Sequence, residues 1–136
     1  MVKLYAGLSG SGKTKEMIQA INRALEQETG SLVCIERGGK LRYDVNYKVR
    51  LIEYSEYQLE GMEALKAFIS GLHAGNFDIT HIFLKSVHRL LGTDKAEAIT
   101  AFCDWCEGFG SANSVSFTMS APIDPEHAPE SLRKYF

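Results

Sequence analysis

A segment of eight residues near the start of the chain has the types and spacing needed to bind phosphate. It reads G-L-S-G-S-G-K-T and fits the pattern G-x-x-x-x-G-K-[ST] at every fixed position. Glycines permit backbone angles and a close approach that a Cβ would block, so successive N–H groups can point toward phosphate oxygens. The lysine can reach the β and γ phosphates, and the threonine hydroxyl can bind Mg²⁺. The segment therefore predicts a nucleotide phosphate site formed by Leu8, Ser9, Gly10, Ser11, Gly12, Lys13 and Thr14.

A second part of such a site is expected where a later apolar strand ends. The segment 80–84 is the best candidate strand, but Lys85 follows it where an aspartate that holds Mg²⁺ is expected. A lysine cannot bind Mg²⁺, and a second ammonium group near Lys13 repels both that lysine and the metal. Three interpretations remain open. Lys85 binds the phosphates in place of the metal, or it points to solvent while Glu36 or Asp124 holds the metal, or the chain keeps only the fold.

The segment after the second expected strand is rich in charge. It reads Glu36-Arg37-Gly38-Gly39-Lys40-Leu41-Arg42 and lies at the strand end that faces the ligand crevice of a parallel sheet. Glu36 can orient a water or a substrate hydroxyl, and Arg37, Lys40 or Arg42 can bind the phosphate of an acceptor. A solvated basic turn is the alternative. The predicted catalytic residues are therefore Lys13 and Glu36.

Three further groups could do chemistry but also have structural explanations. Cys103 and Cys106 are spaced i and i+3, which on a helix favours inward packing over a redox or metal site. His81 alternates with apolar residues on a strand, which favours a hydrogen-bonded histidine. Thr118 and Ser120 can contact a γ-phosphate, although ordinary strand polarity without a function is the favoured explanation.

These residues must be positioned by short apolar runs that alternate with longer helical stretches. The expected strands are 2–6, 32–35, 49–54, 80–84 and 115–119, and the first expected helix, with apolar residues at helical spacing, is 12–28. This alternation predicts an α/β fold with a largely parallel sheet. Together with the loop, it predicts a three-layer α/β/α domain of the phosphate-loop (P-loop) NTPase kind, with about five mostly parallel strands.

Two other helix boundaries are predicted from capping patterns. Ser55 and Gln58 form an S-x-x-Q pattern, which predicts a capping box at the start of a helix. Thr93 is expected to cap a later helix, and Gly108 and Gly110 are expected to end it. A short helix is expected between them at 87–91.

Composition limits the class of protein. A chain of 136 residues, 45% of them hydrophobic, suits one domain over residues 1–136. The 15 basic and 17 acidic side chains give a net charge of −2, which argues against nucleic acid as a partner. Four tyrosines near basic residues are better explained by strand composition; they are Tyr43, Tyr47, Tyr54 and Tyr57.

The chain shows no targeting or spanning segment. No apolar run approaches the roughly 18–20 residues of a membrane span, and the first residues are too short for a secretory signal. The three cysteines are too few for a disulfide framework. We therefore expect a cytoplasmic protein with reduced thiols and no membrane span.

Several segments together resemble a known family. They are Lys3-Leu4-Tyr5-Ala6-Gly7 leading into Gly12-Lys13-Thr14, then Cys34-Ile35-Glu36, Lys40-Leu41-Arg42-Tyr43-Asp44 and Thr80-His81-Ile82-Phe83. The chain resembles small bacterial phosphate-loop proteins labelled ATP-binding or twitching-motility-ATPase-like, over nearly its whole length. In that family an aspartate usually follows the fourth strand, so Lys85 departs from the pattern. The chain is too short to contain the extra domain of a hexameric motility motor, so the resemblance does not imply that function.

The function predicted from the sequence is binding of a purine nucleotide. The absence of an N-K-x-D motif for guanine favours ATP over GTP, and ADP stays open as an alternative. Lys85, counted among the nucleotide-binding residues, leaves Mg²⁺ in doubt and implies weak or no hydrolysis. Two alternatives stay open. One is a small-molecule phosphotransferase that uses Glu36 as a base. The other is a non-catalytic regulatory or interaction module, in which the nucleotide alters the oligomeric state or the binding of a protein partner.

Overall fold

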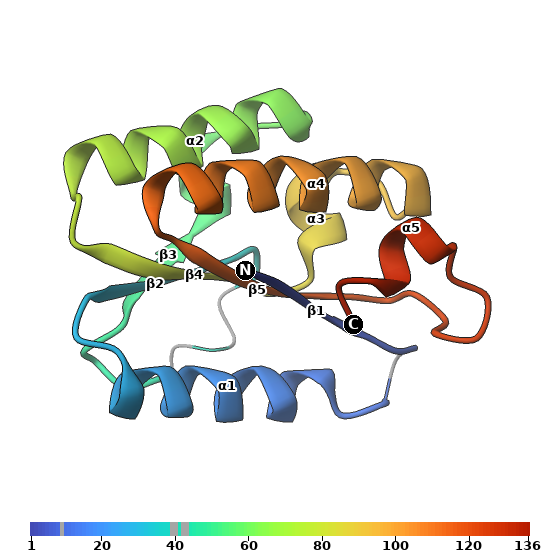
Figure 1. The fold of residues 1–136 in the computed structure, drawn as a ribbon, viewed down its shortest axis with the longest axis horizontal. Helices are drawn as coiled ribbons and strands as arrows, with labels where there is room; N and C mark the ends of the chain where they lie inside the picture. The colour runs from blue at the N-terminus through green and yellow to red at the C-terminus, as the bar shows by residue number, and fades with distance from the viewer. Residues whose placement is uncertain (9, 39–40, 42–43) are drawn as a thin grey trace.

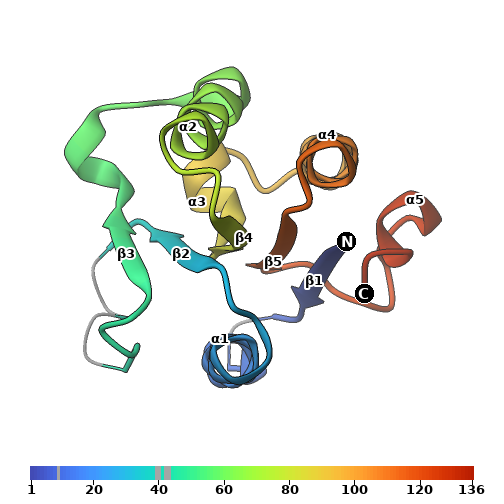
Figure 2. The same ribbon diagram turned by 60° about the vertical axis from the view of Figure 1, so that its left-hand side comes forward.

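A computed structural model describes residues 1–136 except 9, 39–40 and 42–43. Five parallel strands form one sheet in the order β1-β5-β4-β2-β3, with helices on both faces (Figures 1 and 2). The strands are β1 (Val2–Ala6), β2 (Ser31–Glu36), β3 (Arg50–Glu53), β4 (Ile79–Leu84) and β5 (Ser116–Ala121). The helices are α1 (Lys13–Gln27), α2 (Gly61–Gly75), α3 (Val87–Leu91), α4 (Ala96–Asn113) and α5 (Glu130–Arg133). The predicted three-layer α/β/α class is confirmed, and every strand pair is parallel.

The two faces of the sheet bury two separate sets of side chains. Alternate residues of β2 and β4 point to opposite faces, as strand geometry requires, and both strands are buried along nearly their whole length. Leu32, Cys34 and Phe83 pack with Met17 and Ile21 of α1. The opposite face packs against α2, α3 and α4 in a larger core. Among the described helices, α1 is therefore the one that covers the first of these two faces of the sheet, and its first turn lies at the carboxyl end of the sheet (Figure 1).

The segment after α5 lies along one edge of the sheet, and β3 forms the other edge. The backbone N–H of Leu4 in β1 donates to the carbonyl of Tyr135 at 2.7 Å, and Lys3 Nζ donates to the carbonyl of Phe136 at 2.7 Å. The segment after α5 thus lies along the outer side of β1, while β3 forms the opposite edge. Covering an edge strand satisfies backbone groups that would otherwise be free to pair with another chain.

Three predicted helix boundaries are wrong. Ser55 does not cap α2: it lies in a 3₁₀ turn (Tyr54–Tyr57), its N–H bonds the Glu53 carboxylate at 3.1 Å, and α2 begins only at Gly61. Thr93 precedes the start of α4 by three positions, and its hydroxyl accepts a bond from the Lys95 N–H at 3.2 Å. The predicted pattern of residue types was present, but the chain turns locally before each helix begins.

The third error concerns the end of α4. The helix runs through Gly108 and Gly110 to Asn113. A Cβ at Gly110 would lie 2.3 Å from the carbonyl oxygen of Val115, so the glycine allows the chain that leaves α4 to pass close to the helix. Gly110 is therefore needed for packing and does not end the helix.

Among the residues that the structure describes, no helix is both long and apolar enough to cross a membrane.

Candidate functional site

The loop after β1 contains two glycines in a backbone conformation that other residues rarely adopt. β1 ends at Ala6 and α1 begins at Lys13. Gly10 and Gly12 have φ angles of 84° and 88°, in the left-handed region that favours glycine. Gly12 occupies the N-cap of α1, and no side chain of a described residue caps this helix. The first N–H groups of α1 are therefore left without a side-chain partner, as in a site for an anion.

Lys13 folds back on the loop. Its Nζ donates to the carbonyls of Gly7 at 2.5 Å and Leu8 at 3.0 Å, and it lies 3.4 Å from Ser11 Oγ. Burial lowers the pKa of Lys13, and the carboxylate of Glu16 opposes that shift. The Lys13 side chain thus holds the loop through contacts with three of its residues.

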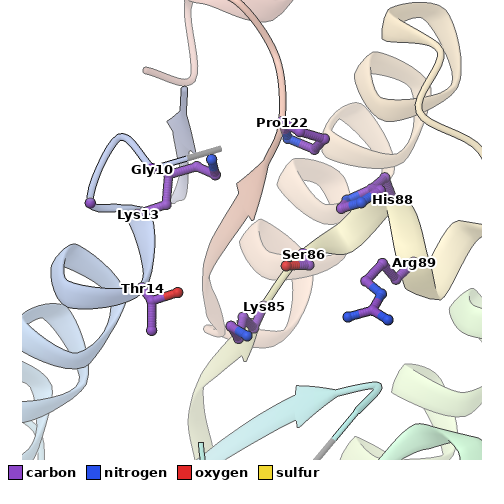
Figure 3. Close-up of a pocket in the computed structure, with 9 residues that line it drawn as sticks. Gly10, Lys13, Thr14, Lys85, Ser86, His88, Arg89 and Pro122 are labelled. Atoms are coloured by element: carbon purple, nitrogen blue, oxygen red, sulfur yellow. The ribbon is translucent and has the colours of Figure 1, made fainter. Parts of the chain in front are cut away.

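The turn from β4 into α3 forms the wall opposite the loop. The N–H of Lys85 donates to the Ile35 carbonyl at 3.1 Å, and the N–H of Ser86 donates to Ser120 Oγ at 2.8 Å. Ser86 has a φ of 52°, so the chain reverses sharply at this residue. These bonds tie the turn to its two neighbouring strands, and Lys85 lies between the loop and Arg89 (Figure 3).

Strand order sets the distance between these walls. β5 lies between β1 and β4, so the loop and the Lys85 turn end strands that are two spacings, roughly 10 Å, apart. A cavity of about 670 Å³ lies between them, which we call the loop cavity. Its lining is Gly10, Gly12, Lys13, Thr14, Lys85, Ser86, His88, Arg89 and Pro122. Among the described residues that line it there are three cationic side chains and no carboxylate, so the cavity is suited to an anion.

Lys85 forms an ion pair with Glu36 at the edge of this cavity. The two residues follow paired positions of adjacent strands, and Lys85 Nζ lies 3.9 Å from Glu36 Oε1. The Glu36 side chain is 2% exposed, and its Oε2 accepts the N–H of Leu41 at 2.9 Å. Glu36 lines a smaller neighbouring cavity beside β3 instead of the loop cavity. The predicted catalytic carboxylate therefore does not line the loop cavity, although it forms an ion pair with Lys85, which does.

The described residues do not fit a carboxylate-held Mg²⁺. Mg²⁺ usually binds one or two carboxylates together with substrate phosphates. Thr14 lines the loop cavity, but no described carboxylate does. Asp124, the other predicted substitute, bonds His127 Nδ1 at 2.6 Å and the Glu126 N–H at 3.0 Å. No group of three or more His, Cys, Asp or Glu side chains suited to a metal occurs in the described part of the chain.

His88 and Arg89 are site residues that the sequence did not reveal. Burial lowers the pKa of His88, the charge of Arg89 lowers it further, and Asp94 opposes these effects. The positive charge beside the cavity thus contributes to the lowered pKa of His88. The sequence feature that could have identified His88 and Arg89 is their position one turn after β4, at the strand end that faces the crevice of a parallel sheet.

Several other predicted residues have structural partners. His81 bonds Glu28 through Nδ1 and Thr118 through Nε2, both at 2.7 Å, and stacks on Phe83, so the hydrogen-bonded histidine is confirmed. Ser120 holds the Ser86 N–H. Cys103 and Cys106 are free and buried, as expected from their spacing. Ser9, Lys40 and Arg42 lie outside the described residues.

No protein-family model matches the chain, and no curated protein sequence matches it significantly.

Proposed function

We propose that this protein binds a purine nucleotide, with the phosphate groups in the loop cavity. The proposal is supported by the meeting of two separate features in one cavity. On one side lie the loop and the uncapped first turn of α1. On the other side lie Lys85 and Arg89, so a chain of phosphates placed between them contacts cations at both ends.

We further propose that binding depends little on Mg²⁺ and that hydrolysis is weak or absent. The ammonium group of Lys85 supplies positive charge where a metal is usually held, and the loop cavity has no described carboxylate to hold the ion or activate a water. ATP remains the preferred nucleotide, and membership in the small ATP-binding family remains a prediction.

The test is a titration with a fluorescent ATP analogue, once with Mg²⁺ and once with EDTA. We expect similar affinities in both conditions. We expect Lys13→Ala to weaken binding by about ten-fold or more, since a charge-assisted hydrogen bond contributes roughly 1.5–3 kcal/mol. Lys15→Ala, which removes the same charge from the exposed side of α1, should leave affinity unchanged.

Two outcomes would contradict the proposal. Absence of binding in both conditions would remove nucleotide as the ligand. Binding that requires Mg²⁺ would show that another carboxylate completes a metal site, and the metal-independent part of the proposal would then be wrong.

A further inference from the structure

A second cavity adjoins the loop cavity, with Arg89 lining both. Its volume is about 640 Å³. It lies on the α2 side of the sheet, between the turn that follows β2, the start of α2 and the end of α3. The residues that line it are Arg37, Glu60, Gly61, Arg89, Leu90, Leu91 and Gly92. None of the predicted nucleotide-binding residues lines this cavity.

Arg37 is held in place on one side of the second cavity. Its guanidinium lies over the ring of Tyr54, 5.5 Å from the centroid, and its Nη2 donates to the Leu59 carbonyl at 3.4 Å. Its Nε is shielded from solvent and has no hydrogen-bond partner in the described part of the chain. Arg37 forms no ion pair with a described residue. A planar guanidinium fixed in this way keeps donors for an oxyanion at little entropic cost.

Arg89 approaches the same place from α3. A Cβ built on Gly38 would lie 3.5 Å from Arg89 Nη1, so this guanidinium reaches the residue that follows Arg37. Its side chain makes no ion pair or hydrogen bond to a described residue. Two guanidinium groups from different elements therefore line one cavity without a paired carboxylate. The one acidic lining residue, Glu60, is exposed.

This arrangement is suited to a ligand with an oxyanion at one end and a hydrogen-bond donor elsewhere. Paired guanidinium groups bind phosphate and carboxylate through parallel N–H···O bonds, and they repel each other when no anion lies between them. A carboxylate such as Glu60 accepts hydrogen bonds from a hydroxyl or amine. We propose that the second cavity binds the phosphate or carboxylate group of a second small molecule, next to the nucleotide. That this ligand is the second one rests on the proposed function; Arg89 lines both cavities, whereas Arg37 lines this one and not the loop cavity.

The test follows backbone amide signals by NMR while inorganic phosphate is added to protein saturated with an ATP analogue. A parallel titration uses acetate, which separates a phosphate ligand from a carboxylate ligand. We expect phosphate, acetate or both to shift the amides of Gly61 and Gly92, while Gly10, Gly12 and Thr14 keep the positions set by the nucleotide.

The matched variants are Arg37→Gln and Arg23→Gln, which remove the same charge. Arg23 lies on α1 and bonds Tyr5, away from both cavities. We expect Arg37→Gln to weaken the oxyanion binding about ten-fold or more and to leave nucleotide affinity unchanged. We expect Arg23→Gln to change neither. The wild-type amide shifts give the location of binding even where Arg37→Gln folds poorly.

The results separate the two proposals. Loss of nucleotide binding overturns the proposed function, while the same titration on nucleotide-free protein still tests the second cavity through Gly61 and Gly92. If neither anion shifts these amides, or if Arg37→Gln binds as tightly as wild type, the second site is wrong. Nucleotide binding to the loop is unaffected by that outcome.

Discussion

At the scale of single residues, the Lys85–Glu36 ion pair is the feature that links the charge of the loop cavity to the stability of the fold. A carboxylate that is 2% exposed needs a partner, and Lys85 Nζ at 3.9 Å is its charged partner among the described residues. The same ammonium lines the loop cavity. Lys85 thus neutralises a buried carboxylate and offers positive charge to a ligand at the same time.

A double-mutant cycle tests this dual role. We expect Lys85→Met to destabilise the protein by about 3–5 kcal/mol, because it removes the charged partner of a buried carboxylate. Adding Glu36→Gln should recover about half of the loss, while anion affinity stays low in both variants. Urea unfolding measures the stability, and the fluorescent ATP analogue measures affinity. Equal stability of wild type and Lys85→Met would show that the ion pair is unimportant.

Two histidines with lowered pKa values make the free energy of unfolding depend on pH. Burial lowers the pKa of His81, although Glu28 opposes the shift, and burial together with Arg89 lowers the pKa of His88. The unfolded chain therefore takes up protons first, near the ordinary value of 6.5. Stability should be fully present above that value and should fall as the pH drops below it.

Measurement of unfolding by urea between about pH 7.5 and 5 checks this prediction. His88→Gln should reduce the slope, and His127→Gln, at an exposed histidine, serves as the control. Nucleotide binding should raise the pKa of His88, because phosphate charge offsets that of Arg89. An NMR titration of the His88 ring that shows no such rise would contradict the placement of an anion in the loop cavity.

At the scale of elements, α4 shows how a residue type can mislead. Two glycines near its end predict a helix stop, yet only one of them has a packing reason to be glycine. A Cβ at Gly110 would lie 2.3 Å from the Val115 carbonyl, whereas no atom lies within 4 Å of a Cβ at Gly108. The close approach of the following chain explains the glycine at 110.

Alanine at these two positions should therefore act in opposite directions. Gly108→Ala should stabilise the protein by up to about 1 kcal/mol, because alanine favours the helical backbone. Gly110→Ala should destabilise it by about 2 kcal/mol or more, because backbone must move. Thermal unfolding of both variants measures the difference. A stabilising Gly110→Ala would mean that α4 and the following turn pack less closely than the structure shows.

The elements of the site were predicted better than their caps. Residues 2–6 and 87–91 were predicted at the bounds that the structure has, since periodic apolar residues mark them clearly. Ser55 was misassigned because its N–H and hydroxyl both bond the Glu53 side chain, which comes from the preceding strand. A capping pattern reflects the conformational preference of a short segment alone, and here the hydrogen bonds from Ser55 to the Glu53 carboxylate prevail over that preference.

At the scale of the whole molecule, the segment after α5 protects the strand that carries the loop. Leu132 is fully buried in the larger core, and Tyr135 bonds β1 through its carbonyl and Asp104 of α4 through its hydroxyl. Burial raises the pKa of Tyr135, and the bond to the Asp104 carboxylate adds to the shift, so the hydroxyl stays protonated as a donor. The last residues therefore join β1 to α4.

Truncation of one side chain tests that role. We expect Leu132→Ala to cost about 2–4 kcal/mol, the usual loss for a buried leucine. Ser131→Ala, at the exposed neighbour, should change stability little. Urea unfolding measures both. A cost for Leu132→Ala as small as that for Ser131→Ala would show that this segment contributes little to holding β1.

The sequence by itself predicted the phosphate-loop motif, the strands and the layer class, because each is recognised from patterns of residue types close together in the chain. Glycine spacing, the apolar run before it and the helical stripe after it are local properties. Tertiary structure decided the order of the strands, which places β5 between β1 and β4 and so opens the loop cavity. It also decided that Lys85 pairs with Glu36 and that Arg37 and Arg89 line one cavity, since these residues come from elements far apart in sequence. Those pairings depend on strand register and on packing across the sheet, which no single segment of the chain specifies.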